Sequence, residues 1–352
     1  MHFIYDHINN PWVGGGGAVR VYEIYKRLSL KGHSICVVSS RYPQAKDYSE
    51  GSLTMKFVGL DKNYVLSVFS YTLCANIYLQ NNYNKYDTII EDFPAPWNPL
   101  FSMRIKNKLV ILQIQNYLGK EVLKQYGVWG FPFYLVEKFY AKLFRKWIVV
   151  NDSLNKRFSI KGEIIPNAIE KKQGNSDSTE GKYLAFLGRI NIYQKGLDVL
   201  LRAFSICNIK TGLKIAGDGK DSGVFLNLIK GRNNLDWVGG VKDEEKESFI
   251  RNAIALIIPS RYEGQGIVVL EAAAFGKPVI VSDIPELDYA VKAGFGLSFK
   301  SEDAFDLAKK IKFLLANEGL REEMGHKARE YAKDFTWDKI AKEYEIFLCR
   351  LY

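Results

Sequence analysis

Two glutamates flank an apolar stretch of this sequence, RYEGQGIVVLEAAAFGKPVIV (261–281). Glu263 follows a strand-like run, AIALIIPS (253–260), and Glu271 falls about a turn and a half into the helix-like run after it. Ligands of open α/β sheets bind at such strand-to-helix edges. Alternatively, Glu263 only stabilises the helix start electrostatically and Glu271 is a surface residue, because two glutamates at this spacing are common by chance.

The start of the same helix offers backbone groups to an anion. Free N–H groups at Gly266, Ile267 and Val268 can hold phosphate oxygens, and glycine lets those oxygens come close to the backbone. The apolar residues between the two carboxylates would cover the sheet. The segment therefore predicts an anion site at a sheet edge.

A second segment supplies cations for such an anion. FLGRINIYQKG (186–196) places Gly188 and Arg189 at the end of a strand and Lys195 just before a helix. Arginine offers a planar fork and lysine a compact charge, the two kinds of cation used on a diphosphate. Taken alone, an arginine and a lysine at this spacing more often lie on a solvent-exposed face of the protein.

A glycine-rich segment, WVGGGGAVRVYEIYKRL (12–28), stands between a strand and a helix. Its spacing is not G-x-G-x-x-G, because position 19 is Val19. The second strand ends in SSR (39–41), without the acidic residue that would hold an adenine ribose, so NAD binding is disfavoured. A loop that lets a ligand or another domain approach the backbone fits the glycines better, and a flexible connector is the alternative.

Strand-like and helix-like segments alternate along the chain, which predicts an α/β fold of mostly parallel sheets with helices on both faces. In the first half we expect a helix at 18–32 and strands at 2–8, 34–40, 87–92, 109–115 and 146–152. The polar segment 164–182, which contains Pro166, has no sustained period and is typical of a linker.

The alternation restarts after this linker. We expect strands at 183–190, 213–219, 235–239, 253–260 and 277–283, and helices at 196–206, 222–231, 243–252 and 266–275. From residue 301 onward the pattern is helical. Two successive α/β domains, 1–166 and 167–335, are the simplest interpretation, with a terminal helix at 336–352 that packs back on the first domain.

Length and composition restrict the class of protein to which the chain can belong. With 352 residues, 47% hydrophobic and 25% charged, the chain has the balance of a globular protein of about two domains. Residues 1–5 show no export signal, and no apolar run reaches the roughly 20 residues of a membrane-spanning helix. Four scattered cysteines and four histidines form no metal-binding pattern and are typical of a cytoplasmic protein with reduced thiols.

Most of the net charge of +10 lies in one region, because residues 101–172 hold fourteen lysines and arginines against five acidic residues. Within it, the segment 117–150 mixes aromatic residues with six cations, a combination that suits an anionic membrane surface. Alternatively, Phe139, Leu143 and Trp147 fall at helical spacing and are core residues. Nucleic acid is disfavoured as a partner, because the aromatic residues follow a helical period.

Taken together, these motifs resemble a known enzyme family. Gly16 and Gly17 open the first helix, GR is followed by a lysine–glycine pair, GDG stands at 217–219, VGGV stands at 238–241, and an E-x7-E closes with LEAAAFGKPVI. This set spans nearly the whole chain and is similar to the retaining glycosyltransferases of family 4, among the glycosyl transferases of group 1. The resemblance implies the GT-B fold, two facing Rossmann-like domains with the active site in an interdomain cleft.

The resemblance also implies a role for each motif residue. The catalytic residues would be Glu263, which faces the donor sugar, and Arg189 and Lys195, which neutralise the diphosphate. Glu271 would accept hydrogen bonds from the ribose of a UDP- or GDP-sugar. The other donor-binding residues would be Gly16, Gly17, Gly188, Gly239, Gly266, Ile267 and Val268. The sugar would move to a saccharide or lipid-linked acceptor with its anomeric configuration kept, and no metal or other cofactor would be needed.

The sequence departs from the family pattern at two glutamines. Gln115 stands where many members carry a histidine, and glutamine cannot act as an acid or base although it can hydrogen-bond a sugar hydroxyl. Glu91 and Asp92, at a strand end, are alternative acceptor-side carboxylates, or else charges of a surface loop. Gln265 replaces the aromatic residue common between the two glycines, Gly264 and Gly266.

Two other functions stay open at this point. A nucleotide-sugar epimerase on the same scaffold would consume donor without an acceptor, and a carbohydrate- or nucleotide-binding protein would use the same cleft without turnover. We expect a cytoplasmic location, with peripheral contact to the inner face of the membrane through residues 117–150.

Overall fold

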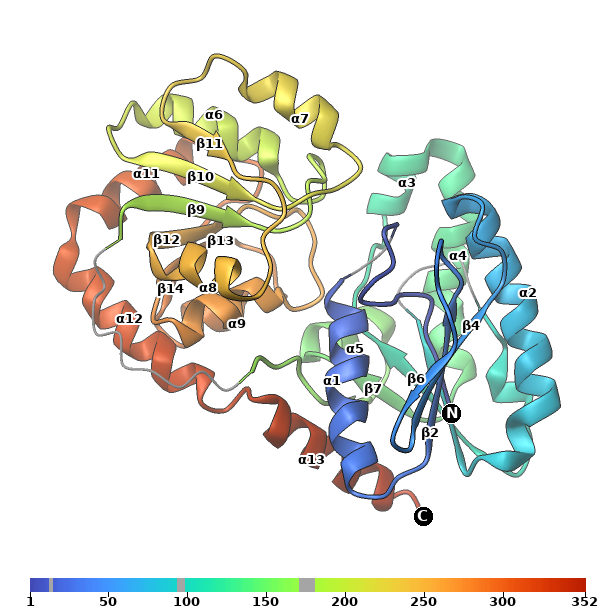
Figure 1. Cartoon of the computed structure of the whole chain (residues 1–352). Coiled ribbons are helices and arrows are strands. Elements are labelled where there is room, and N and C mark those ends of the chain that lie inside the picture. The colour runs from blue at the N-terminus through green and yellow to red at the C-terminus, as the bar shows by residue number, and fades with distance from the viewer. Residues whose placement is uncertain (13–14, 94–98, 171–180) are drawn as a thin grey trace. The chain divides into compact units, whose positions relative to one another are not determined.

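The computed structural model describes residues 1–12, 15–93, 99–170 and 181–352, and it divides into two compact units (Figure 1). Unit 1 contains Met1–Ala168 and Trp337–Tyr352, and unit 2 contains Ile169–Thr336. Gly14 of the glycine-rich segment and residues 171–180 of the expected linker lie outside the described residues.

Unit 1 is built on an eight-stranded sheet in the order β3-β4-β2-β1-β5-β6-β7-β8. Neighbouring strands pair in parallel, except that β3 and β4 form an antiparallel hairpin. The strands are β1 (His2–Phe3), β2 (Ile35–Ser40), β3 (Tyr48–Glu50), β4 (Leu53–Val58), β5 (Thr88–Asp92), β6 (Leu109–Ile114), β7 (Trp147–Val149) and β8 (Glu163–Ile164).

Helices cover both faces of this sheet. On one face, α1 and α13 pack on strand residues such as Ile90 and Ile111, and on the other face α2 and α4 pack on the alternate strand residues (Figure 1). The helices of unit 1 are α1 (Gly16–Leu30), α2 (Tyr64–Asn82), α3 (Glu121–Tyr126), α4 (Phe131–Tyr140), α5 (Asp152–Phe158) and α13 (Trp337–Cys349). Short 3₁₀ turns are η1 (Tyr83–Lys85), η2 (Ser102–Arg104), η3 (Gly127–Gly130) and η4 (Ala141–Leu143).

Two features of unit 1 differ from the expectation. The sequence predicts the first strand over 2–8, but β1 ends at Phe3, because the chain remains buried through Tyr5 after it leaves the ladder and therefore keeps its apolar character. The segment between Arg41 and Tyr86 carries no prediction, although it forms β3, β4 and the long helix α2.

Unit 2 is built on a six-stranded sheet in the order β11-β10-β9-β12-β13-β14, and every pair of neighbours is parallel. The strands are β9 (Tyr183–Leu187), β10 (Gly212–Ala216), β11 (Leu235–Trp237), β12 (Ala253–Ile258), β13 (Val279–Ser282) and β14 (Gly296–Phe299). Because all strands point the same way, the loops that follow β9, β10 and β12 leave the sheet at one edge.

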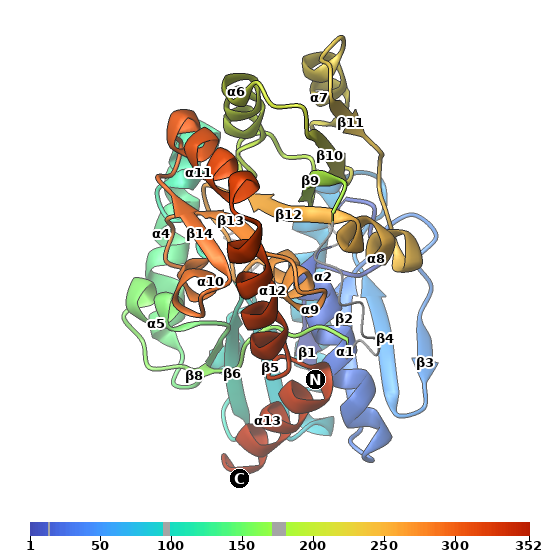
Figure 2. The same ribbon diagram turned by 90° about the vertical axis from the view of Figure 1, so that its left-hand side faces the viewer.

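Helices again lie on both faces of the unit 2 sheet. One face carries α6 (Leu197–Cys207), α7 (Ser222–Ile229) and α11 (Ala304–Ala316). The other carries α8 (Asp243–Arg251), α9 (Ile267–Ala274), α10 (Asp288–Lys292) and α12 (Glu318–Ala332), with α12 beside α9 (Figure 2). The prediction of mostly parallel sheets with helices on both faces is confirmed in each unit. Among the described helices, no helix has the length and apolar character needed to cross a membrane.

Candidate functional site

An ion pair between Lys195 and Glu263 lies at the carboxyl edge of the unit 2 sheet. Lys195 belongs to the loop after β9 and Glu263 to the loop after β12, and Lys195 Nζ lies 2.5 Å from Glu263 Oε1. Ser260 Oγ donates to the same carboxylate oxygen at 2.7 Å. Both charged side chains are largely buried, 16% and 10% exposed. The sheet therefore presents one cation and one carboxylate together at the edge where ligands of α/β sheets bind.

Glycine at position 196 makes this contact possible. Gly196 precedes α6 with φ 61°, a left-handed backbone conformation, and a Cβ atom there would lie 1.9 Å from the carbonyl oxygen of Pro259. Any side chain would push the loop after β9 away from the loop after β12. The lysine–glycine pair of the sequence is thus a packing requirement of the two loops that bring Lys195 to Glu263.

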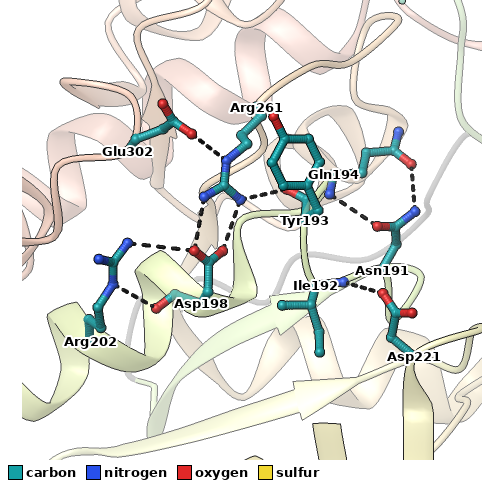
Figure 3. Close-up of polar contacts among 9 residues, drawn as sticks. All are labelled: Asn191, Ile192, Tyr193, Gln194, Asp198, Arg202, Asp221, Arg261 and Glu302. Carbon is teal, nitrogen blue, oxygen red and sulfur yellow. Dashed lines mark hydrogen bonds and ion pairs between the residues drawn. The ribbon is translucent and has the colours of Figure 1, made fainter. Parts of the chain in front are cut away.

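Arg261 binds these two loops together by hydrogen bonds to backbone carbonyls, and Figure 3 shows its guanidinium beside Tyr193. Its backbone N–H donates to the carbonyl of Gln194 at 2.9 Å, and its Nη1 donates to the carbonyl of Tyr193 at 2.6 Å. The guanidinium also lies over the Tyr193 ring, with 4.5 Å between its carbon and the ring centroid. Tyr193 and Gln194 immediately precede Lys195, so Arg261 fixes the turn that carries the lysine.

Carboxylates hold the Arg261 guanidinium in this position. Its two Nη atoms form a bidentate pair with Asp198 of α6 at 2.8 and 2.9 Å, and its Nε donates to Glu302 at 2.6 Å (Figure 3). Hydrogen bonding to Asp198 raises the pKa of Arg261 above its already high usual value. Burial alone would raise the pKa of Asp198, but its hydrogen bonds and ion pair with Arg261 outweigh burial and lower it.

Two further hydrogen bonds stabilise the loop between β9 and α6. The N–H of Ile192 donates to Asp221 Oδ2 at 2.8 Å, and the N–H of Gln194 donates to Asn191 Oδ1 at 3.0 Å (Figure 3). The loop between β9 and α6 is therefore fixed by side chains on both sides of Tyr193. A lysine on so constrained a turn has a defined position before any ligand arrives.

Arg189 is not part of this contact. Its side chain is exposed, and within the described ranges it forms no hydrogen bond or ion pair.

Two glycines of the motifs lie near the same sheet edge. Gly188 is close to Lys195, because a Cβ atom at position 188 would be 4.0 Å from Lys195 Cε. The carbonyl of Gly239 accepts the N–H of Gly217 at 2.7 Å, which places the VGGV segment beside the end of β10.

Glu271 is separated from Glu263 by the start of α9. Its Oε1 pairs with Lys246 Nζ of α8 at 2.7 Å, and its side chain is only 18% exposed, so it is not a freely solvated surface residue. Gly266 is the N-cap of α9, and Ile267 and Val268 begin its first turn, where N–H groups have no acceptor within the helix. The predicted anion-binding amides are therefore at a true helix start.

Tyr289 of α10 supports this helix start and was not singled out from the sequence. Its hydroxyl donates to the carbonyl of Gln265 at 3.0 Å. Burial raises the pKa of this phenol well above its usual value, so the hydroxyl stays a donor. The Gln265 side chain is itself buried. Tyr289 thereby fixes the turn between Glu263 and α9.

In unit 1, Gln115, Asp92 and Gly17 come together at the start of α1. Gln115 Nε2 donates to Asp92 Oδ2 at 2.5 Å, and Gln113 Nε2 donates to the same oxygen at 2.6 Å. A Cβ atom at Gly17 would lie 3.0 Å from Gln115 Nε2, so glycine leaves the room that this side chain occupies. Gly16 is the first residue of α1. Asp92 Oδ1 is buried and has no hydrogen-bond partner among the described residues.

Glu91 and Asp92 are not charges of a surface loop. Both lie in β5 and are only 1% exposed, so that alternative is wrong. Glu91 accepts the N–H of Leu100, the hydroxyl of Tyr140, and both the N–H and the hydroxyl of Ser102. Burial raises the pKa of Glu91, and these hydrogen bonds oppose the rise. Its oxygens are occupied by the protein, which corrects the acceptor-side role expected for Glu91.

The segment 117–150 is only partly core. Phe139 and Leu143 are 51% and 54% exposed, so the core alternative is wrong for these two residues. Trp147 is partly buried in β7, and its Nε1 donates to the carbonyl of Ala141 at 2.7 Å. No group of three or more potential metal ligands occurs among the described residues of either unit.

The unit that carries this site resembles known proteins in sequence. Residues 167–331, nearly all of unit 2, match the family model described as Glycosyl transferases group 1. The chain is 31% identical over 203 residues to an uncharacterized glycosyltransferase, MJ1178, of Methanocaldococcus jannaschii, covering 56% of this chain and 57% of that protein. It is 27% identical over 267 residues to the O-antigen biosynthesis glycosyltransferase WclY of Escherichia coli, covering 69% of this chain and 72% of that protein. The chain thus spans about half the length of MJ1178.

Solved structures match the whole chain. Sucrose-phosphate synthase of Thermosynechococcus elongatus has a TM-score of 0.79 at 18% identity, covering 100% of this chain and 99% of that one. Anabaena Alr3699/HepE, solved in complex with UDP and glucose, has a TM-score of 0.73 at 15% identity, covering 99% and 100%. The fold is therefore GT-B, in which two α/β units with parallel sheets follow each other along the chain.

Proposed function

We propose that this chain is a group 1 glycosyltransferase that moves a sugar from a nucleotide-sugar donor to a hydroxyl of a saccharide or lipid-linked acceptor. The observation that carries the proposal is the Lys195–Glu263 pair, fixed between the loops after β9 and β12. It lies in the unit that matches the family model. The UDP and glucose in the complex of the Anabaena neighbour support a nucleoside diphosphate sugar as the donor.

In this proposal the donor diphosphate binds beside Lys195. Negative charge grows on the phosphate oxygens as the bond to the sugar breaks, so a cation already in place lowers the barrier. Arg189, which is exposed and can turn toward the ligand, and the first-turn amides Ile267 and Val268 add to this site. Glu263 contacts the donor sugar.

Glu271 accepts hydrogen bonds from the ribose of a UDP- or GDP-sugar in this proposal, and its pair with Lys246 holds the carboxylate in place for them. The roles expected for Gly16, Gly17, Gly188 and Gly239 stay predictions.

We also propose, as in the retaining family 4, that the sugar keeps its anomeric configuration and that no divalent ion is needed. The fixed cation and the helix start supply the positive charge that a metal ion supplies in other sugar transferases. The four cysteines are free, in keeping with a cytoplasmic location.

A donor panel tests the proposal. Calorimetry and turnover are measured with UDP-, GDP- and ADP-sugars, with and without EDTA, and NMR of the product gives the anomeric configuration. Transfer that is unchanged by EDTA, with retention, is the expected result. Donor consumption without an acceptor would identify an epimerase, and binding without turnover would identify a binding protein. No binding of any nucleotide sugar would refute the proposed function.

A further inference from the structure

Helix α2 has an apolar face that the protein does not cover. Ser67, Val68, Tyr71, Ala75 and Leu79 are its buried residues and pack on the unit 1 sheet. Four residues at helical spacing point away from the sheet and are exposed, namely Val65, Phe69, Leu73 and Ile77, with Phe69 65% and Leu73 64% exposed. No Asp, Glu, Lys or Arg occurs anywhere in Tyr64–Asn82. A helix on a water-exposed surface normally carries charges on that side.

A second group of exposed apolar residues lies in η3, α4 and η4. Val128 and Trp129 are the most exposed, at 83% and 81%. Phe131, Leu135, Phe139 and Leu143 continue the group at near-helical spacing. Of the twenty-eight exposed large apolar side chains of the described residues, fifteen lie between residues 60 and 143. Exposed apolar surface is therefore concentrated in this part of unit 1.

Both groups belong to the same layer of unit 1. Leu79 and Ala75 of α2 pack on Phe3 and Val38, while Tyr140 of α4 packs on Leu112 and the residues around it. These strand residues alternate with Ile90, Ile111 and Ile148, which contact α1 and α13. Side chains alternate between the two faces of a sheet. α2 and α4 therefore both cover the sheet face opposite α1, and their outer sides face the same side of unit 1.

The chain around the second group is rich in positive charge, and four of its cations, Lys138, Lys142, Arg145 and Lys146, lie within 126–146. Residues 101–146 contain nine cations: Arg104, Lys106, Lys108, Lys120, Lys124, Lys138, Lys142, Arg145 and Lys146. The two carboxylates in the same range are already bound within the protein. Glu137 is buried and accepts the N–H groups of Leu118 and Gly119, and Glu121 pairs with Lys124. Cations also lie on exposed aromatic rings, since Lys138 Nζ is 5.5 Å from the Phe139 centroid.

We propose that this surface, defined as the outer side of α2 together with residues 126–146, lies on an anionic lipid bilayer. Apolar side chains enter the acyl boundary, Trp129 sits at headgroup depth, and the surrounding lysines and arginines bind lipid phosphates. A second copy of this chain is a poorer occupant, because a two-fold symmetric contact would bring the same cations of both copies together. The inference goes beyond the proposed activity and is tested without any sugar transfer.

Vesicle sedimentation of the full chain tests the proposal. Vesicles of phosphatidylcholine with about a third phosphatidylglycerol are compared with pure phosphatidylcholine vesicles. We expect binding to the anionic vesicles only, weakened at about 1 M salt, where the Debye length falls to about 3 Å. The double variant Phe69→Ser/Leu73→Ser should bind at least about tenfold more weakly, because each residue contributes apolar area to the contact.

A matched variant in unit 2 controls for the general loss of exposed apolar surface. Phe313→Ser/Leu226→Ser removes the same residue types from exposed positions of α11 and α7 and should bind vesicles like the parent chain. Thermal unfolding and donor binding, both measured without lipid, should be equal in the two variants, so a failed fold or a failed donor site is seen separately.

Equal loss of vesicle binding in the two double variants would overturn the proposal, as would equal binding of the parent chain to neutral and anionic vesicles. A dimer that dissociates in the α2 variant, without any vesicle binding by the parent chain, would assign the surface to contact between copies instead.

Discussion

Arg261 is the residue whose removal should separate Lys195 from Glu263 without touching either. Its side chain binds the carbonyl of Tyr193 and so helps to fix the turn that carries the lysine, whereas the bond from its backbone N–H to the Gln194 carbonyl remains when the side chain is removed. We therefore expect Arg261→Ala to lower kcat by about a hundredfold, because a displacement of about 1 Å of a positioned group can cost that much. The Michaelis constant for the donor should change less, since under the proposed function the diphosphate charge beside Lys195 grows toward the transition state.

The stability cost of the same variant follows from its partners. Asp198 and Glu302 are 37% and 54% exposed, so solvent screens both ion pairs, which contribute about 1 kcal/mol or less each. The hydrogen bond to the Tyr193 carbonyl adds about 1 kcal/mol. The total is therefore at most about 3 kcal/mol, which corresponds to a fall in the melting temperature of unit 2 of up to roughly 10 °C, measurable by calorimetry.

Arg202 provides a matched control for this prediction. It contacts the same Asp198 carboxylate at 3.5 Å, but its side chain is 61% exposed and it binds neither loop carbonyl. Arg202→Ala should cost less than about 1 kcal/mol and leave kcat unchanged. Arg261→Lys keeps the charge but loses the planar fork, so its kcat should be intermediate. Equal kcat values for Arg261→Ala and Arg202→Ala would refute the positioning role.

Three further variants test other parts of the structure. Lys195→Ala should reduce kcat far more than donor affinity, and equal losses in steady-state kinetics and calorimetry would contradict its role on the growing diphosphate charge. Gly17→Ala should displace Gln115 from Asp92 and raise the KM for the acceptor. Gly15→Ala, where a Cβ atom meets none of the described residues within 4 Å, should not. Burial lowers the pKa of Lys277 to about 8, so the folded chain binds fewer protons than the unfolded chain above that value. The free energy of unfolding from urea titrations should thus rise between pH 8 and 10.5, from the lowered pKa up to the ordinary pKa of a lysine, and Lys277→Met should abolish that rise.

The fold could be predicted from the sequence because the patterns that mark its strands and helices are local. Each parallel strand of unit 2 is a short apolar run followed by a loop and a helical period, so β9, β10, β12 and β13 were located close to their observed bounds. Helix α2 was missed for the converse reason. Its exposed side is as apolar as its buried side, so the amphipathic period that marks a surface helix is absent.

The candidate site was only partly accessible, because its decisive contacts join distant loops. The motifs indicated that Lys195 and Glu263 stand at strand ends, but their pairing across the sheet edge depends on the three-dimensional order of β9 and β12. The contact of Arg261 with Asp198 likewise joins two residues far apart in the chain. For Glu91 the sequence was misleading. Its place at a strand end indicated a carboxylate available to a ligand, but in the structure it accepts hydrogen bonds from four donors of the protein.

The carboxylate beside Lys195 also bears on which anions the site accepts. A lysine next to a helix start would attract any phosphate, because both carry positive potential. Glu263 already satisfies that lysine, and an incoming anion must compete with a partner held in place by Ser260. A diphosphate that also contacts the first-turn amides of α9 can make this exchange more readily than a single phosphate, since it spreads its charge over several donors. Under the proposed function, the ion pair would thus favour a nucleotide sugar over monophosphates. This selectivity depends on the repulsion by Glu263 as much as on the attraction by Lys195.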